Sequence, residues 1–122
     1  MKLHRSTALA LVIVAGCSAG AKVDDAKAYV QQALEVWQSG GKAESLTSRS
    51  PAIEFHEAMW NAGEKLVRFE MGGAQYVPRD NLVRCETRLT LRNRKGKEHT
   101  EGVTFDVVSM EPTVKIVNNP MP

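Results

Sequence analysis

The sequence predicts an α+β domain in which an N-terminal helix packs on a three- to four-stranded antiparallel sheet. Apolar residues first recur at helical spacing, and farther along the chain they alternate with polar residues in several short stretches. A helix followed by a run of strands is typical of an α+β domain with the helix laid on one sheet face. The length of 122 residues, with 43% apolar and 25% charged residues, favours one folded domain over a multidomain enzyme or a multi-pass membrane protein.

The helix is predicted to begin at Asp24, whose carboxylate can cap the first turn. Asp24 and Asp25 also place negative charge at the positive end of the helix dipole, which stabilises the helix. Its apolar positions lie three or four residues apart and form one face: Ala26, Tyr29, Val30, Ala33, Leu34 and Trp37. Gly40-Gly41 is expected to end the helix, because glycine tolerates the left-handed backbone of a C-cap. Residues 42–50 are expected to add one or two helical turns.

Two weaker strand signals follow the helix. Ile53 and Phe55 alternate like a short strand, although residues 57–62 could instead turn helically. Residues 66–71 also alternate, and the pattern assigns opposite faces of a strand to two sets, Val67, Phe69 and Met71 against Leu66, Arg68 and Glu70. Gly72-Gly73 is expected to form a turn after this strand.

The clearest strand runs from Leu82 to Asn93. Alternation with a period of two directs one set of side chains towards the core and the other towards solvent, namely Val83, Cys85, Thr87, Leu89 and Leu91 against Arg84, Glu86, Arg88, Thr90 and Arg92. Residues 94–97 predict a turn, and the apolar face continues on the return strand through Val103, Phe105 and Val107. Residues 114–117 supply a last strand.

Residues 1–16 have the features of a secretory signal peptide: basic residues, then an apolar run over residues 8–15, and no acidic residue. That run is far shorter than the ~18 residues that a membrane-spanning helix needs. The residues Val14-Ala15-Gly16-Cys17 resemble a bacterial lipobox, in which an aliphatic residue and two small ones precede the cysteine that is lipidated. The match departs from the usual pattern at Val14, where the family most often has leucine. The alternatives are an ordinary cleaved signal peptide, with Cys17 incidental, and an uncleaved or cytosolic chain.

The lipobox resemblance implies that cleavage leaves Cys17 with a thioether-linked diacylglycerol and usually an N-acyl chain. Two or three chains of the length of palmitate anchor a protein stably in a membrane. Ser18 in place of an aspartate favours the outer membrane in the sorting pattern of some Gram-negative bacteria. The predicted organisation is a signal peptide at 1–16, a lipidated tether at 17–23, the domain at 24–118 and a tail at 119–122. Even at full extension the tether would span no more than about 20 Å, which would keep the domain close to the lipid headgroups.

The predicted order of elements is similar to that of the cystatin-like and nuclear-transport-factor-2-like cone folds. In those folds a long N-terminal helix packs on a curved antiparallel sheet. The similarity spans the whole mature domain and rests on element order, without a sequence motif. The placement of Trp37, Trp60 and Phe69, the charged hairpin and the proline-containing final bend is also similar to small uncharacterised lipoproteins of bacterial envelopes, and this similarity implies no activity.

Removal of residues 1–16 would leave 14 basic and 14 acidic side chains, which argues against nucleic acid as a partner. Within this neutral chain, residues 79–97 hold seven basic and two acidic residues. Six of these cations form the candidate contact with an anionic lipid, an acidic glycan or an acidic protein: Arg84, Arg88, Arg92, Arg94, Lys95 and Lys97. The alternative is a solvated sheet face and turn whose charges prevent edge aggregation.

Cys85 is expected to fill the core as a small apolar residue, the alternatives being a redox or intermolecular thiol and a metal ligand. Glu54, His56 and Glu57 place an imidazole among carboxylates, but their spacing is not that of a metal site, and His99 is expected in the far hairpin. The sequence also lacks a nucleophile elbow and a phosphate-binding loop. We therefore expect no metal, no cofactor and no enzymatic activity.

The leading hypothesis is a non-catalytic, lipid-anchored domain of the cell envelope with a partner-binding or structural role. This hypothesis predicts a filled hydrophobic core that includes Trp37, Phe69, Leu89, Leu91 and Phe105. The alternative is a cone-fold ligand-binding or enzymatic domain, which needs a cavity on the order of several hundred Å³ between helix and sheet, with polar groups directed into it. The predicted strands direct mainly Thr87 and Ser109 inward.

Overall fold

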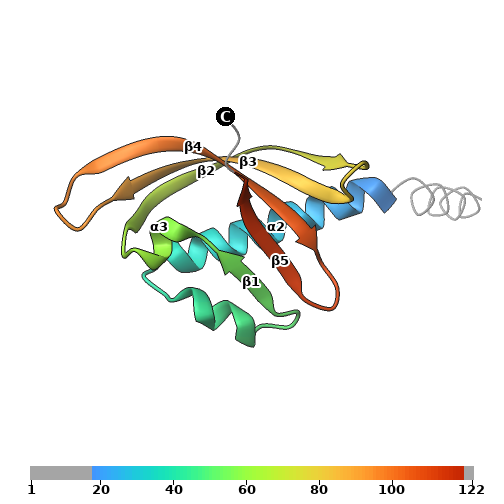
Figure 1. Cartoon of the computed structure of the whole chain (residues 1–122), viewed down its shortest axis with the longest axis horizontal. Coiled ribbons are helices and arrows are strands. Elements are labelled where there is room, and N and C mark those ends of the chain that lie inside the picture. Colours follow the sequence, from blue (N-terminus) through green and yellow to red (C-terminus); the bar gives the residue numbers. More distant parts are fainter. Residues whose placement is uncertain (1–17, 120–122) are drawn as a thin grey trace, which may run out of the picture.

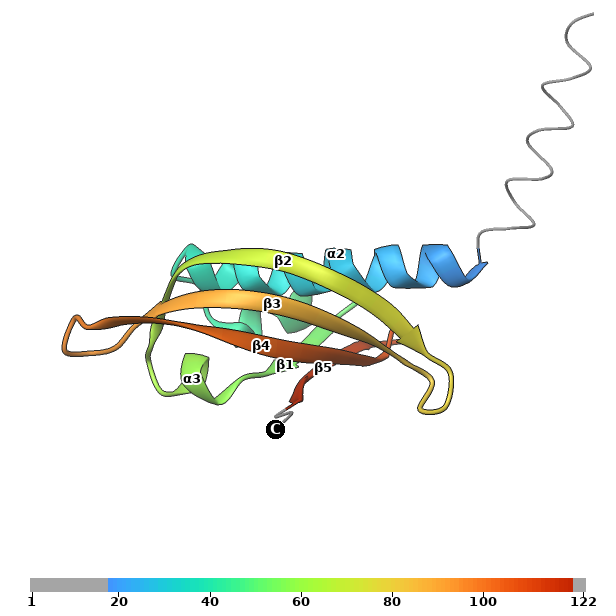
Figure 2. The same ribbon diagram turned by 90° about the horizontal axis from the view of Figure 1, so that it is seen from above.

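The computed structural model describes residues 18–119 and contains a five-stranded sheet that curves around one long helix (Figures 1 and 2). The strands lie in the order β1-β5-β4-β3-β2, and all neighbours are antiparallel except β1 and β5. Along the chain the elements are α2 (Ser18–Gln38), the 3₁₀ helix η1 (Ala43–Ser48), β1 (Ile53–His56), α3 (Ala58–Asn61), β2 (Lys65–Val77), β3 (Leu82–Arg92), β4 (Glu98–Ser109) and β5 (Val114–Asn119). The predicted α+β class is confirmed, with five strands in place of three or four.

The additional strand, β1, comes from the segment for which the sequence admits two interpretations. Both are present, because β1 is followed directly by the short helix α3. Glu57 joins the two elements: its buried carboxylate accepts hydrogen bonds from the Met59 amide and from Asn118 Nδ2, each at 2.7 Å. The strand then pairs in parallel with β5, an arrangement that alternation within four residues cannot indicate.

Helix α2 begins at Ser18, before the predicted start at Asp24. Residues 18–23 are rich in small helix-forming residues, and Val23 extends the apolar face by packing against the core. Residues 18–23, assigned by the sequence to the tether, are therefore the first turns of α2. The predicted apolar face is confirmed, with Tyr29 partly buried and the remaining positions in the core. Gly40, at a φ of 88°, follows the end of the helix as expected.

Strand β2 is longer than predicted and contains two bulges opposite β3. Val67 is the extra residue of the first bulge, so that Leu66 and Phe69 both face the core. The prediction that placed Leu66 on the opposite face is wrong, because a bulge reverses the alternation of side chains. Gly72-Gly73, expected as a turn, form the second bulge within the strand, opposite Glu86.

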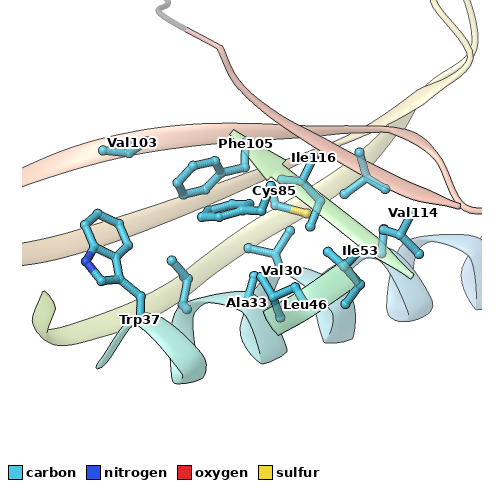
Figure 3. Close-up of a cluster of buried hydrophobic side chains, with 14 of the residues drawn as sticks. Val30, Ala33, Trp37, Leu46, Ile53, Cys85, Val103, Phe105, Val114 and Ile116 are labelled. Carbon is cyan, nitrogen blue, oxygen red and sulfur yellow. The ribbon is translucent and has the colours of Figure 1, made fainter. Parts of the chain in front are cut away.

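The predicted facing of β3 is confirmed. Its inward side chains are all buried, and Glu86, Arg88 and Arg92 are exposed on the other face. Thr90, predicted to face solvent, is instead buried, with its Oγ1 3.0 Å from Thr100 Oγ1. The predicted inward residues of the return strand β4 are buried as well: Val103, Phe105 and Val107. Figure 3 shows how side chains of α2, among them Val30 and Trp37, meet this sheet face.

The two ends of the sequence are described only in part. The predicted signal peptide and lipobox, residues 1–17, and residues 120–122 lie outside the described residues. Asn119, assigned to the tail by the sequence, instead ends β5 and donates a hydrogen bond to Asp106 at 2.9 Å. Among the described residues, no helix combines the length and the apolar character needed to cross a membrane.

Candidate functional site

The β3–β4 hairpin extends beyond the body of the domain and ends in a turn at residues 93–97, here called the hairpin tip (Figures 1 and 2). The side chain of Asn93 orders this turn: its Oδ1 accepts hydrogen bonds from the amides of Lys95 and Lys97 at 2.9 and 3.0 Å. The backbone closes the turn through bonds from Asn93 N to the Lys97 carbonyl and from Gly96 N to the Asn93 carbonyl. Four hydrogen bonds thus define the backbone of the tip.

Three cations lie on the hairpin tip, and all three are exposed: Arg94, Lys95 and Lys97. Within residues 18–119, none of them forms an ion pair with a carboxylate. The Arg94 guanidinium lies against Gly63, where a Cβ atom would come within 3.1 Å of its Nε. The tip therefore presents three cations to solvent.

The arginines of β3 are in a different situation, because register places acidic residues of β4 beside two of them. Arg84 Nε and Nη2 donate to the two carboxylate oxygens of Asp106, at 2.9 and 3.2 Å, and this hydrogen bonding raises the Arg84 pKa. Arg92 donates to Glu98 at 2.7 Å and holds the pKa of that carboxyl below its usual range. The charges of Arg84 and Arg92 are thus matched within the sheet.

Arg88, the remaining candidate on the strand, lies across from Glu70 on β2 and Gly102 on β4. Opposite charges on facing strands attract each other across the sheet. The six candidate cations consequently do not form one continuous surface. Arg94, Lys95 and Lys97 share the tip, whereas the three arginines of β3 lie on a sheet face of mixed charge.

The two hydroxyl groups that the sequence directs inward, those of Thr87 and Ser109, both have hydrogen-bond partners. Thr87 Oγ1 donates to the Val103 carbonyl at 2.8 Å, and Ser109 Oγ donates to the Thr113 carbonyl at 2.9 Å. Cys85 is fully buried, and this burial raises the pKa of its thiol to about 11, against the opposing effect of the Lys27 charge. Its expected place in the core is confirmed.

The candidate cluster around His56 is divided by the backbone. His56 and Glu54 lie on the exposed side of β1, with Nε2 and Oε1 3.9 Å apart, whereas Glu57 is buried and caps α3. Within the described part of the chain, no group of three or more His, Cys, Asp and Glu side chains is arranged to hold a metal ion.

Sequence reasoning missed a cluster at the base of the hairpin. His99 Nε2 lies 3.1 Å from Glu101 Oε2 and 3.9 Å from Glu64 Oε1, and that Glu64 oxygen is buried without a hydrogen-bond partner. Alternation along β4 indicates that His99 and Glu101 share a face, but Glu64 precedes β2 and nothing in the sequence links it to them. The Trp37 indole nitrogen donates to the Glu64 carbonyl at 2.9 Å, which connects the cluster to the end of α2.

Two adjoining surface hollows lie at the opposite end of the domain, around the first turns of α2. Their volumes are about 630 and 310 Å³, and both are lined by Lys22, Met110 and Glu111. The larger hollow also meets Asp25 and Tyr29 of the helix. The volume that the ligand-binding hypothesis needs is therefore present at the rim of the fold, whereas the interface between the middle of α2 and the sheet is filled.

The fold and site together define a small α+β domain, built from one helix and a curved five-stranded sheet, that presents an ordered cationic hairpin tip. Comparisons with protein-family models, with curated proteins and with solved structures give no match.

Proposed function

We propose that the protein is a non-catalytic domain of a bacterial cell envelope, anchored in the outer membrane by lipid on Cys17, that binds an anionic partner through its hairpin tip. The anchor rests on the lipobox resemblance of Val14-Ala15-Gly16-Cys17. The observation that carries the binding role is the group of three exposed cations, without ion pairs in residues 18–119, on a turn ordered by Asn93.

Of the six candidate cations, the three on the hairpin tip are those that would contact the anionic partner. Arg84 and Arg92 already satisfy a carboxylate each, so a partner would have to displace Asp106 or Glu98 to engage them fully. Lys95 and Lys97 require no such exchange, because their ammonium groups are exposed and unmatched in the described chain. Clusters of exposed cations attract anionic surfaces over about a Debye length.

The absence of catalysis is also part of the proposal. It is supported by the inward hydroxyls of Thr87 and Ser109, which both donate to backbone carbonyls. It is supported further by Cys85, because a buried thiol with a raised pKa is a poor nucleophile.

The alternative is a ligand-binding domain of the cone-fold kind. The order of helix and curved sheet supports it, and so do the hollows of about 630 and 310 Å³ beside Lys22. This alternative can be distinguished from the first proposal at Tyr29, because a ligand in the larger hollow would contact that side chain. Binding that is lost in Tyr29→Ala and kept after removal of the tip charges would favour the ligand-binding domain.

The experiment compares three forms of the chain in a Cys17→Ser background, which removes the expected lipid. They are the unaltered domain, a variant with Arg94, Lys95 and Lys97 replaced by Ser, and a control with Lys42, Arg79 and Lys115 replaced by Ser. The control loses the same charge from exposed positions elsewhere. Co-sedimentation with phosphatidylglycerol vesicles is measured at increasing salt.

We expect the unaltered domain and the control to bind at low salt and the tip variant to lose most of its binding. Binding should also fall as salt shortens the Debye length from about 10 Å at 0.1 M to about 3 Å at 1 M. Melting temperatures should stay close together, because all the replaced side chains are exposed. Equal binding of the tip variant and the control would contradict the proposed role of the tip.

A further inference from the structure

The start of α2 and the hairpin tip lie at opposite ends of the domain (Figures 1 and 2). The helix contains 21 residues, so at about 1.5 Å per residue it alone spans about 30 Å. Ser18, the residue that follows the expected lipidated cysteine, is the first described residue of this helix. A lipid on Cys17 would therefore hold the membrane at the end of the domain that is far from the tip.

This separation decides what the tip can attract. A distance of about 30 Å is about three Debye lengths at 0.1 M salt, so the headgroups around the anchor would scarcely influence Lys95 and Lys97. The tip reaches its own membrane only if the domain lies down on its side.

The charges along α2 provide no attraction that would hold the domain in that orientation. Arg49 donates a hydrogen bond to Gln32 Oε1 and so adds a positive charge to the helix side. The acidic and basic residues there are balanced: Asp24, Asp25 and Glu35 against Lys22, Lys27 and Arg49. On the other side of the domain, two of the three arginines of β3 are matched by carboxylates. Neither side therefore binds an anionic membrane strongly, which leaves the upright orientation with the tip directed away from the membrane.

We infer that the hairpin tip binds a carboxylate-bearing glycan polymer located away from the membrane that holds the anchor. This inference rests on the proposed function. Residues 92–98 contain no aromatic side chain on which a sugar ring could stack, so recognition depends on charge. Three exposed cations make a weak single contact, but a linear polyanion engages the tips of many anchored copies at once and so gains avidity.

The test anchors the chain chemically, so that it does not depend on lipidation in the cell. The mature chain from Cys17 to Pro122 is coupled through the Cys17 thiol to a maleimide lipid in phosphatidylcholine vesicles. Cys85 does not compete, because it is buried and its thiol has a pKa of about 11. The probe is fluorescent alginate, a linear polymer of uronic acids, and the tip variant and the matched control are coupled in the same way.

We expect the unaltered chain and the control to capture alginate at low salt and the tip variant to capture at least about tenfold less. Capture only of free phosphatidylglycerol vesicles, without alginate, would overturn the assignment of a glycan. The assignment of a glycan is also overturned if the anchored chain captures neither probe while the unanchored chain still binds phosphatidylglycerol. This outcome would leave the proposed function in place. Loss of binding in the unanchored chain as well would remove the proposed function itself.

The orientation of the domain on the membrane is measured through the two tryptophans, Trp37 and Trp60. Their stacked rings have centroids 5.3 Å apart and lie near the end of α2 that adjoins the hairpin. Nitroxide-headgroup lipids are added to coupled vesicles that also contain phosphatidylglycerol. We expect the tryptophan fluorescence to be unquenched, because that end of the domain faces away from the membrane. Strong quenching that disappears in the tip variant would show that the tip binds its own membrane, and would overturn the inference.

Discussion

At the scale of single residues, neighbours rather than residue type determine what each charged side chain does. Arg84 and Lys95 are both cations of the same hairpin, but Arg84 lies beside a buried carboxylate and Lys95 projects from a turn. The partner of Arg84 is Asp106, which is 22 residues away along the chain. Alternation predicted which way Arg84 points, whereas its ion pair depends on strand register, and the sequence of one strand does not contain that information.

Leu89 and Arg88 test the facing of β3 most directly. Leu89 is fully buried, whereas Arg88 is exposed on the opposite face. Leu89→Ala should lower the free energy of unfolding by about 2–5 kcal/mol, because it removes packed apolar contacts and leaves a cavity. Arg88→Ala should change it by no more than about 0.5 kcal/mol. Denaturant melts of the two variants measure the difference, and effects of equal size would mean that the facing is reversed.

Cys85 should be nearly inert towards thiol reagents in the folded protein. With its pKa raised to about 11, the thiolate fraction at pH 8 is roughly a hundredfold lower than that of an ordinary exposed thiol. The folded state keeps its proton where the unfolded state loses it, so Cys85 disfavours folding as the pH rises from the ordinary thiol pKa towards 11.

The measurement is the rate of reaction with a disulfide reagent in a Cys17→Ser background, before and after denaturation. The rate should rise strongly on denaturation. Cys85→Ala provides the control for alkaline melts, since it should remove this contribution to the loss of stability. Fast labelling of the native chain at pH 8 would contradict the buried position of the thiol.

At the scale of elements, the long-range features of the sheet are those that local patterns could not predict. Helix α2 and strands β3 and β4 follow from periodicity, because α2 and β3 bury one face along most of their length and β4 buries alternate residues over its second half. Strand β2 does not, since a bulge at Val67 changes which residues face inward. The parallel pairing of β1 with β5 depends on where Glu57 and α3 direct the chain, which a four-residue alternation leaves open.

The second bulge of β2 offers a test with a control beside it. A Cβ atom at Gly72 would lie 3.1 Å from the Glu86 carbonyl oxygen, whereas a Cβ atom at Gly73 would meet nothing within 4 Å. Gly72→Ala should therefore destabilise the protein by about 1–3 kcal/mol, because backbone must shift to relieve the contact. Gly73→Ala should stay within about 0.5 kcal/mol. Thermal melts compare the two, and a larger loss in Gly73→Ala would contradict this bulge geometry.

At the scale of the whole molecule, the start of α2 and the hairpin tip lie at opposite ends of the domain. The sequence predicted the helix and the basic turn, but not their separation, because this depends on how α2 crosses the sheet. The two rim hollows near Lys22 lie at the end where α2 starts, far from the tip. A partner bound at the tip would therefore leave the hollows accessible.

The proposed anchor depends on one atom, the sulfur of Cys17, so a single substitution can test it. Cys17→Ser replaces the thiol that would form the thioether, so incorporation of labelled palmitate should disappear and the chain should be left as unprocessed precursor or as protein released from the membrane fraction. Ser18→Ala is the matched control, because it changes the adjacent residue and keeps the thiol, and its labelling should persist. Two or three acyl chains give stable anchoring, so the control should also stay with the membranes through a high-salt wash. Palmitate that still enters the Cys17→Ser chain would show that the lipobox interpretation is wrong, and the tip would then lose its fixed direction without losing its charge.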